Sequence, residues 1–326
     1  MRYIGTALIA ALLLLEGAAR LAGFGSTLVY ERTDYGYRVA PSQAITRLGK
    51  ATYYNDLGLR NSGASALPAE NALRILCIGD SITYGGTQTD QSLTFPYQLQ
   101  KLLSSSRSDR KIEVLNASAG GWATENEEGW IHSHGVLGAN WVVLQVATHD
   151  LFQERSGSEI VGTHPSFPDR QPQFALQDVV TRYALPLIGQ LSHDPGVDIA
   201  HRSVADVHRV LRSIERINTK VRLSRAKLAV LFVEQPTGIE PTDNLTLWAK
   251  QQLFIQLSKL EIPVIRPAQA IEQSGGARLF RDGLHPNAEG NQILARSLMV
   301  FLDTSETSRH AQRPVSPEIS TVGGAR

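Results

Sequence analysis

The chain has 326 residues, of which 42% are hydrophobic and 19% are charged, and its formal net charge is +1 at pH 7. This composition is that of a globular protein with enough apolar residues for one large core or two modest ones, and it excludes disorder through the middle of the chain. The near-zero charge and the single cysteine also exclude chain-wide attraction to nucleic acid and a zinc-type cysteine cluster, so nucleic acid is not an expected partner.

The chain opens on an export signal. Arg2 precedes an apolar run, 3–15, which Glu16 and Arg20 interrupt. This run fits the h-region of a signal peptide, whereas a spanning helix needs about 20 residues. No clean Ala-x-Ala cleavage site follows, so an uncleaved anchor is slightly favoured over a removed peptide for 1–24; a buried N-terminal helix is the third alternative. Arg2 predicts that the rest of the chain is exported, on the periplasmic or extracellular face and tethered to the inner membrane.

Beyond a turn-rich segment, 25–72, that we expect to wrap the core, short apolar runs alternate with helical patterns. This alternation predicts an α/β fold, a three-layer α/β/α sandwich around a mainly parallel five-stranded sheet, over 73–303. The predicted strands are 73–78, 112–116, 141–147, 227–234 and 262–265. The predicted helices are 95–105, 126–137, 174–191, 204–223, 245–260 and 288–302.

Two segments stand outside this alternation. The proline-rich excursion 151–202 is long for a compact domain and is interpreted as an insertion that resembles a lid or binding loop. The tail 304–326, rich in Ser, Thr, Arg, Pro and Gly, is expected to be disordered. Cys77 lies in an apolar strand pattern, which predicts burial, and a single cysteine says nothing about the redox compartment.

Functional groups of parallel sheets gather at the carboxyl ends of the strands. Ser81 follows the first strand within the run Gly-Asp-Ser, so its hydroxyl should lie at the rim of the sheet and its backbone N–H should be a first oxyanion donor. The alternative is a turn serine that caps a helix, and the bare tripeptide arises by chance in about one chain of this length in ten.

An acid and a histidine near the end of the chain complete a nucleophilic set. Asp282 and His285 are three residues apart around Gly283, which allows the carboxylate to meet one imidazole nitrogen while the other faces Ser81. A serine hydroxyl becomes a good nucleophile when a histidine takes its proton, and the histidine needs a carboxylate to fix its tautomer. The alternative is a solvated surface loop.

These motifs resemble those of the SGNH hydrolases, the superfamily of GDSL-type esterases and lipases. Three of the family's four blocks match, at 79–85, 116–121 and 282–286. The resemblance implies the family's fold and a serine nucleophile at Ser81, with His285 as general base and Asp282 as the residue that orients it. It also implies that Gly121 donates its backbone N–H to the oxyanion, and it implies no cofactor or metal.

The remaining block departs from the pattern. Where the family has Gly-x-Asn-Asp, this chain has Ala-Thr-His149-Asp150. His149 can replace the asparagine as an oxyanion donor, can be structural and bonded to Asp150 or to backbone, or can contact the acyl donor or a sugar. Trp122, next to Gly121, is a candidate for a flat surface under a sugar ring, with core packing as the plainer alternative.

The residues thus predict acyl transfer through a serine ester, and the resemblance to envelope-anchored bacterial members predicts O-acyl, in particular O-acetyl, esters on an exported or cell-envelope polysaccharide. An O-acyltransferase using the same triad, a lipase, and a non-catalytic glycan-binding protein are the alternatives. The expected partners are an acylated small molecule or polysaccharide and, through 1–24, a membrane; the sequence fixes no oligomeric state.

Overall fold

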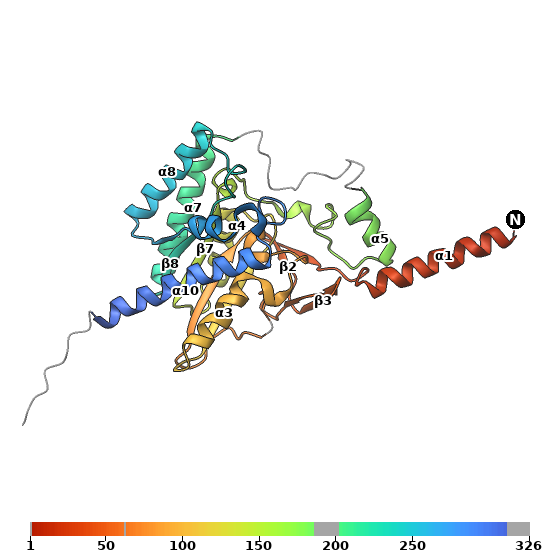
Figure 1. Ribbon diagram of the computed structural model, residues 1–326, viewed down its shortest axis with the longest axis horizontal. Helices are drawn as coiled ribbons and strands as arrows, with labels where there is room; N and C mark the ends of the chain where they lie inside the picture. Colours follow the sequence, from red (N-terminus) through yellow and green to blue (C-terminus); the bar gives the residue numbers. More distant parts are fainter. Residues whose placement is uncertain (1, 62, 186–201, 312–326) are drawn as a thin grey trace, which may run out of the picture.

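A five-stranded parallel sheet forms the centre of the protein (Figure 1). The computed structural model describes residues 2–61, 63–185 and 202–311. The strands lie in the order β6-β5-β7-β8-β9, and every neighbouring pair is parallel. They are β5 (Leu73–Gly79), β6 (Ile112–Ser118), β7 (Trp141–Ala147), β8 (Lys227–Val233) and β9 (Val264–Ile265). Because the chain moves from β5 to β6 and then returns past β5 to β7, the strand order reverses between β5 and β7, which is where sheets of this kind place their ligands.

Side chains of the strands alternate between two cores. In β5, Leu76 and Ile78 pack on one side of the sheet and Ile75 and Cys77 on the other, and all four are fully buried. Strands covered on both faces are expected to be almost uniformly apolar, as β5 is. The burial predicted for Cys77 is therefore confirmed.

Helices cover both faces of the sheet, which confirms the predicted three-layer α/β/α sandwich. One core contains side chains of three helices, α4 (Thr124–His134), α7 (Val204–Leu223) and α8 (Asn244–Lys259). The other contains those of α3 (Phe95–Ser106), α9 (Ala268–Ser274) and α10 (Ala288–Ala311). Local signals set some of the helix ends: Ser203 and Asp206 form a capping box at the start of α7, and Pro96 lies in the first turn of α3.

Several predicted boundaries differ from the structure. The helix predicted at 174–191 is a short α5 (Ala175–Val179) followed by a π-helical turn, η4 (Val180–Ala184), and 186–191 lies outside the described residues. The last helix, predicted to end at 302, continues to Ala311, while 312–326 lies outside the described residues. Short turns escaped prediction altogether: α2 (Ser81–Tyr84), η1 (Gln91–Leu93), η2 (His149–Leu151), η3 (Ser158–Ile160) and η6 (Gly276–Leu279).

The wrapping segment contains regular structure that the sequence reading missed. It forms two antiparallel hairpins, β1 (Tyr30–Thr33) with β2 (Gly36–Val39), and β3 (Gln43–Arg47) with β4 (Lys50–Tyr54). Buried tyrosines of the hairpins, among them Tyr37, join the core that contains α4 and α7. The hairpins therefore belong to the same body as the central sheet.

The N-terminal helix α1 (Arg2–Leu21) projects from the body with its side chains largely exposed (Figure 1). It is long and apolar enough to cross a membrane, by length and composition alone, over Tyr3–Leu21. A signal sequence has the same properties.

Arg60 connects the wrapping segment to the loop that follows Ser81. Its side chain is buried, its Nη1 donates to the carbonyls of Tyr84 and Gly86 (2.8 Å to Gly86), and its Nη2 donates to the carbonyl of Thr89 at 2.7 Å. Three backbone carbonyls thus accept hydrogen bonds from this guanidinium.

We expect Arg60→Ala to lower the free energy of unfolding by about 3 kcal/mol, because it leaves buried acceptors unsatisfied and creates a cavity. Urea unfolding followed by circular dichroism measures this. Arg222→Ala, at an exposed arginine in the last turn of α7, is the matched control and should change stability by less than about 0.5 kcal/mol. Equal effects of the two substitutions would contradict the role given to Arg60.

Candidate active site

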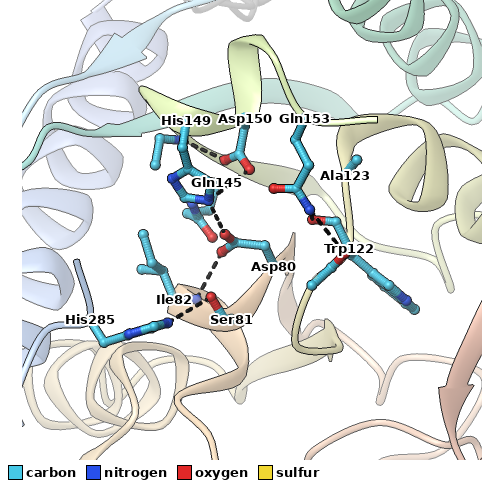
Figure 2. Close-up of polar contacts among 12 residues, drawn as sticks. Asp80, Ser81, Ile82, Trp122, Ala123, Gln145, His149, Asp150, Gln153 and His285 are labelled. Carbon is cyan, nitrogen blue, oxygen red and sulfur yellow. Dashed lines mark hydrogen bonds and ion pairs between the residues drawn. The ribbon is translucent and has the colours of Figure 1, made fainter. Parts of the chain in front are cut away.

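Ser81, His285 and Asp282 form one chain of hydrogen bonds at the carboxyl edge of the sheet. His285 Nε2 lies 2.9 Å from Ser81 Oγ, as Figure 2 shows, and His285 Nδ1 lies 2.9 and 3.0 Å from the two carboxylate oxygens of Asp282. The structure thus brings Ser81 into contact with a histidine 204 positions later in the sequence, and that histidine into contact with Asp282. In the arrangement that these contacts favour, Nδ1–H donates to Asp282 and Nε2 accepts the hydroxyl proton of Ser81.

The loop that carries the acid and the base is fixed by its own backbone. Gly283 has φ +79°, a left-handed conformation that a side chain would strain, and it lets the chain turn back so that Asp282 accepts from the backbone N–H of His285 at 2.9 Å. A bridge between Phe280 and Pro286 closes the loop immediately before α10. The carboxylate therefore holds both the ring and the backbone of His285.

Asp282 stays ionised at neutral pH. Partial burial opposes its charge, but the hydrogen bond from the His285 backbone N–H, together with the charge and ring N–H of His285, keeps the pKa of Asp282 below its usual value. The side chain of Asp282 is 51% exposed and that of His285 is 20% exposed. Solvent therefore reaches Asp282 and His285 directly.

Asp80 shapes the turn that presents Ser81. It is buried, and its Oδ1 accepts the backbone N–H of Ile82 at 2.8 Å, which caps the one-turn helix α2. Gly85 ends α2 in a left-handed conformation (φ +76°) with its N–H bonded to the carbonyl of Ser81. Ser81 is consequently the first residue of a tightly closed turn at the end of β5.

Gly121 occupies the turn after β6, also with a left-handed backbone (φ +76°). A Cβ at this position would lie 3.0 Å from the hydroxyl of Tyr37, which itself donates to the carbonyl of Gly120 at 2.7 Å. The carbonyl of Gly121 accepts from Gln153 Nε2 at 3.0 Å and from Ser156 Oγ at 2.5 Å. The peptide on either side of Gly121 is therefore held by side chains from the first hairpin and the excursion.

His149 contacts carboxylates beside the turn that begins with Ser81. Its Nε2 lies 3.1 Å from Asp80 Oδ2 and 3.2 Å from Asp150 Oδ1, so this nitrogen faces two acids (Figure 2). Asp150 in turn accepts the backbone N–H of Ala147 at the end of β7, at 2.7 Å. His149 thereby links the end of β7 to the cap of α2.

Trp122 is a core residue, which corrects the prediction that it offers a surface to a sugar. It is 1% exposed, its indole N–H donates to the carbonyl of Tyr37 at 2.8 Å, and its ring meets Tyr35 edge-on. An indole packed on its faces and bonded through its only donor leaves no ring face for a ligand. The plainer alternative, core packing, is the correct one.

The sequence analysis gave no role to two buried carboxyl groups near the turn of Ser81, Asp80 and Glu127, and it considered a third, Asp150, only as a partner of His149. Burial raises the pKa of Asp150 to about 7, with the charge of Asp80 adding to the effect, and burial raises the pKa of Glu127 well above its usual value, with Asp150 and Asp80 contributing. Asp150 had a signal in the sequence, since it belongs to the block that departs from the family pattern at His149. Glu127, within α4, had none.

The described residues contain one group of side chains that could hold a metal ion. It consists of Asp80, His149 and Asp150, whose ligand atoms lie within 4.8 Å of one another. The space between the two carboxylates is taken by His149 Nε2, which already contacts both. The arrangement fits an imidazole between two acids, and no step of the chemistry requires a cation here.

A family comparison matches this fold and this site. Residues 77–293 match the family described as GDSL-like Lipase/Acylhydrolase, and this range covers the turn of Ser81 as well as the loop of His285. The chain therefore belongs to the GDSL-like lipase/acylhydrolase family and is an ester hydrolase of the SGNH type. The predicted family and reaction class are confirmed.

Solved structures with a similar fold include TesA (16% identity, 71% of this chain and 98% of that chain covered, TM-score 0.47). The acetyl xylan esterase AlAXEase is similar at 14% identity, with 70% and 99% covered and a TM-score of 0.45. The acetylxylan esterase Axe2 of Geobacillus stearothermophilus, as a catalytic mutant, is similar at 16% identity, with 70% and 92% covered and a TM-score of 0.43. A search of curated proteins returned no match.

The raised pKa of Asp150 predicts how stability depends on pH. The folded state holds the proton of Asp150 up to about pH 7, whereas the unfolded state releases it near pH 4, so this group makes stability fall as pH rises between these values. Asp150→Asn should remove the effect.

The stability of Asp150→Asn relative to the unchanged protein should therefore increase from pH 4 to pH 7, by up to about 1.4 kcal/mol for each unit of pKa separation, and level off above pH 7. Urea midpoints at several pH values measure it. Asp109→Asn, at an exposed carboxylate, is the control and should give a flat difference; a flat difference for Asp150→Asn would show that its pKa is not raised.

Proposed function

We propose that this protein is a serine esterase that removes O-acyl groups, in particular O-acetyl groups, from an exported or cell-envelope polysaccharide. The observation that carries the proposal is the chain of contacts from Ser81 Oγ to His285 and from His285 to Asp282. Family membership indicates that the substrate is an ester. In the proposal, Ser81 is the nucleophile, His285 is its base and Asp282 orients the base.

In the proposed reaction, His285 Nε2 takes the hydroxyl proton of Ser81 as Oγ bonds to the ester carbonyl carbon. The imidazolium, stabilised by the Asp282 carboxylate, then protonates the alcohol oxygen, and the bond between that oxygen and the acyl carbon breaks. Water attacks the resulting seryl ester and gives a proton to His285. Release of the acid returns that proton to Ser81, so atoms and protons balance over the cycle.

We propose the backbone N–H groups of Ser81 and Gly121 as the oxyanion donors. Ser81 opens α2, and the first N–H groups of a helix have no partner within it. The contacts of Tyr37, Gln153 and Ser156 fix the Gly121 turn before substrate arrives, and donors that need no reorganisation are the effective ones.

For His149 we propose a role through Asp80 in preference to direct donation to the oxyanion. The ring nitrogen Nε2 is 3.1 Å from Asp80, whose other oxygen caps the turn of Ser81. A donor committed to a buried carboxylate is not available to the substrate. His149 is then a positioning residue, and direct oxyanion donation is the competing prediction.

The openness of the site supports a large substrate. Asp282 is half exposed and His285 is partly exposed, so an ester carried on a polymer can reach Ser81 without entering a deep tunnel. The apolar helix α1 supports export and tethering, because a chain anchored there would act on glycans outside the inner membrane.

Ser81→Ala should abolish acetate release from acetylated glycans and from p-nitrophenyl acetate, with kcat/KM reduced at least about 10³-fold, because the nucleophile is gone. Ser105→Ala, at an exposed serine of α3, is the matched control and should retain full activity. Equal release by both variants would defeat the assignment of the nucleophile. Hydrolysis of the aryl ester without release from any glycan would defeat the substrate class alone.

His149→Ala separates the two roles of His149. A role through Asp80 predicts that stability and kcat both fall, since the variant leaves a buried carboxylate without its partner, and that Asp150→Asn also lowers kcat. An oxyanion donor predicts a loss of about 10²- to 10³-fold in kcat with unchanged stability and no effect of Asp150→Asn. Thermal unfolding and the separate values of kcat and KM for a small aryl ester decide between them.

A further inference from the structure

The base of α1 is built into the catalytic body. Glu16, in the last turns of α1, accepts the backbone N–H groups of Ala175 and Leu176 at 2.9 Å each, and Arg20 pairs with Glu16 at 2.7 Å. Arg20 also donates to the carbonyl of Gln173. The two charged residues that interrupt this apolar helix therefore both contact the excursion, Glu16 at the first turn of α5 and Arg20 at Gln173 just before it.

The segment after α1 continues this contact. The backbone N–H of Gly25 donates to Asp178 of α5 at 3.1 Å, and Asp178 pairs with the buried Arg47 of β3 and with Arg182 of η4. The ring of Phe24 meets Tyr183 edge-on. Figure 1 shows α5 beside the base of α1, on the side of the body from which α1 projects.

We propose that α5 and η4 form a surface that contacts the membrane, and that this surface and a retained α1 together hold the catalytic body in one orientation on the bilayer. The inference rests on the membrane anchor of the proposed function and names a second, separate contact. The surface comprises Phe174, Val180 and Tyr183, which are 59%, 47% and 42% exposed, together with the 93% exposed Leu21.

Depth supports this assignment. The apolar stretch Tyr3–Leu21 rises about 28 Å as a helix, close to the roughly 30 Å of a bilayer's hydrocarbon core. Glu16 lies about 8 Å below the end of that stretch, at 1.5 Å for each residue. The first turn of α5, bonded to Glu16, then lies below the headgroup boundary by a distance within the roughly 5–10 Å to which interfacial apolar side chains are buried.

Charge and chemistry agree with a lipid surface as the partner. Arg20 and Arg182 lie beside the exposed apolar residues, and Arg47 and Arg182 help to line a small pocket of about 180 Å³ next to Tyr183. Apolar side chains edged by arginine suit the boundary between acyl chains and anionic headgroups. The contacts of Glu16 and Arg20 also favour a retained α1 in this proposal, because cleavage after residue 24 would remove both side chains from the excursion.

The test uses the full-length chain in vesicles of phosphatidylethanolamine and phosphatidylglycerol at a ratio of about 3:1. Single cysteines replace Phe174, Val180, Leu8 or Leu247 in a Cys77→Ala background, and each carries an environment-sensitive nitrobenzoxadiazole label. Leu247, an exposed apolar residue of α8, is the matched control, and Leu8 within α1 reports insertion. Hydrolysis of a small ester confirms that each variant is folded.

We expect lipids with a shallow doxyl quencher to reduce the emission at 174 and 180 at least about twofold and to leave 247 unchanged, while a deep quencher acts at 8. If the label at residue 8 is quenched but the labels at residues 174 and 180 are quenched no more than the label at 247, the contact surface is overturned and the anchor is supported. No quenching at 8 overturns the anchor and the surface together, and it leaves the esterase assignment untouched because the activity is measured separately.

Discussion

The carboxylate of Asp80 is the constraint on which the site depends. One of its oxygens accepts the N–H of Ile82 and so closes the turn that begins with Ser81; the other accepts from His149 at the end of β7. Because β5 and β7 are neighbours at the point where the strand order reverses, a single buried acid can connect the two strand ends. The position of the Ser81 hydroxyl is therefore set by backbone and by a side chain of the adjacent strand, before any contact with His285.

This arrangement has an electrostatic cost that the structure offsets. Asp80, Asp150 and Glu127 are all buried near Ser81, and three negative charges there would oppose the oxyanion of the proposed reaction. Burial and mutual repulsion raise the pKa of Glu127 and that of Asp150, which favours their neutral forms. His149 Nε2 lies 3.1 Å from the second oxygen of Asp80. The turn of Ser81 therefore keeps the buried carboxyl group of Asp80 without gathering three negative charges, because Asp150 and Glu127 favour their neutral forms.

The sequence predicted what depends on local pattern. The four long strands were found because strands buried on both faces are continuously apolar. Ser81, Asp282 and His285 could be proposed as a set because each lies in a short motif at a strand or helix end, and the structure brings them into contact. The hairpins of the wrapping segment were missed because Tyr37 and its neighbours gain their burial from α4 and the excursion, which no local pattern reveals. Trp122 was misread for the same reason: its exposure is decided by Tyr35 and Tyr37, some 85 positions earlier.

The contacts of Arg60 and those of Glu16 form at different stages of chain synthesis. Arg60 finds its acceptors at 84–89, so these contacts can form soon after that loop leaves the ribosome. The hydrogen bond between Glu16 and Ala175 can form only after Ala175 has been synthesised, 159 residues later, and closing so long a loop is slow. Helix α1 thus gains its contacts with the body only after α5 has been synthesised, and until then its apolar side chains are exposed unless a chaperone, a translocon or a lipid bilayer covers them.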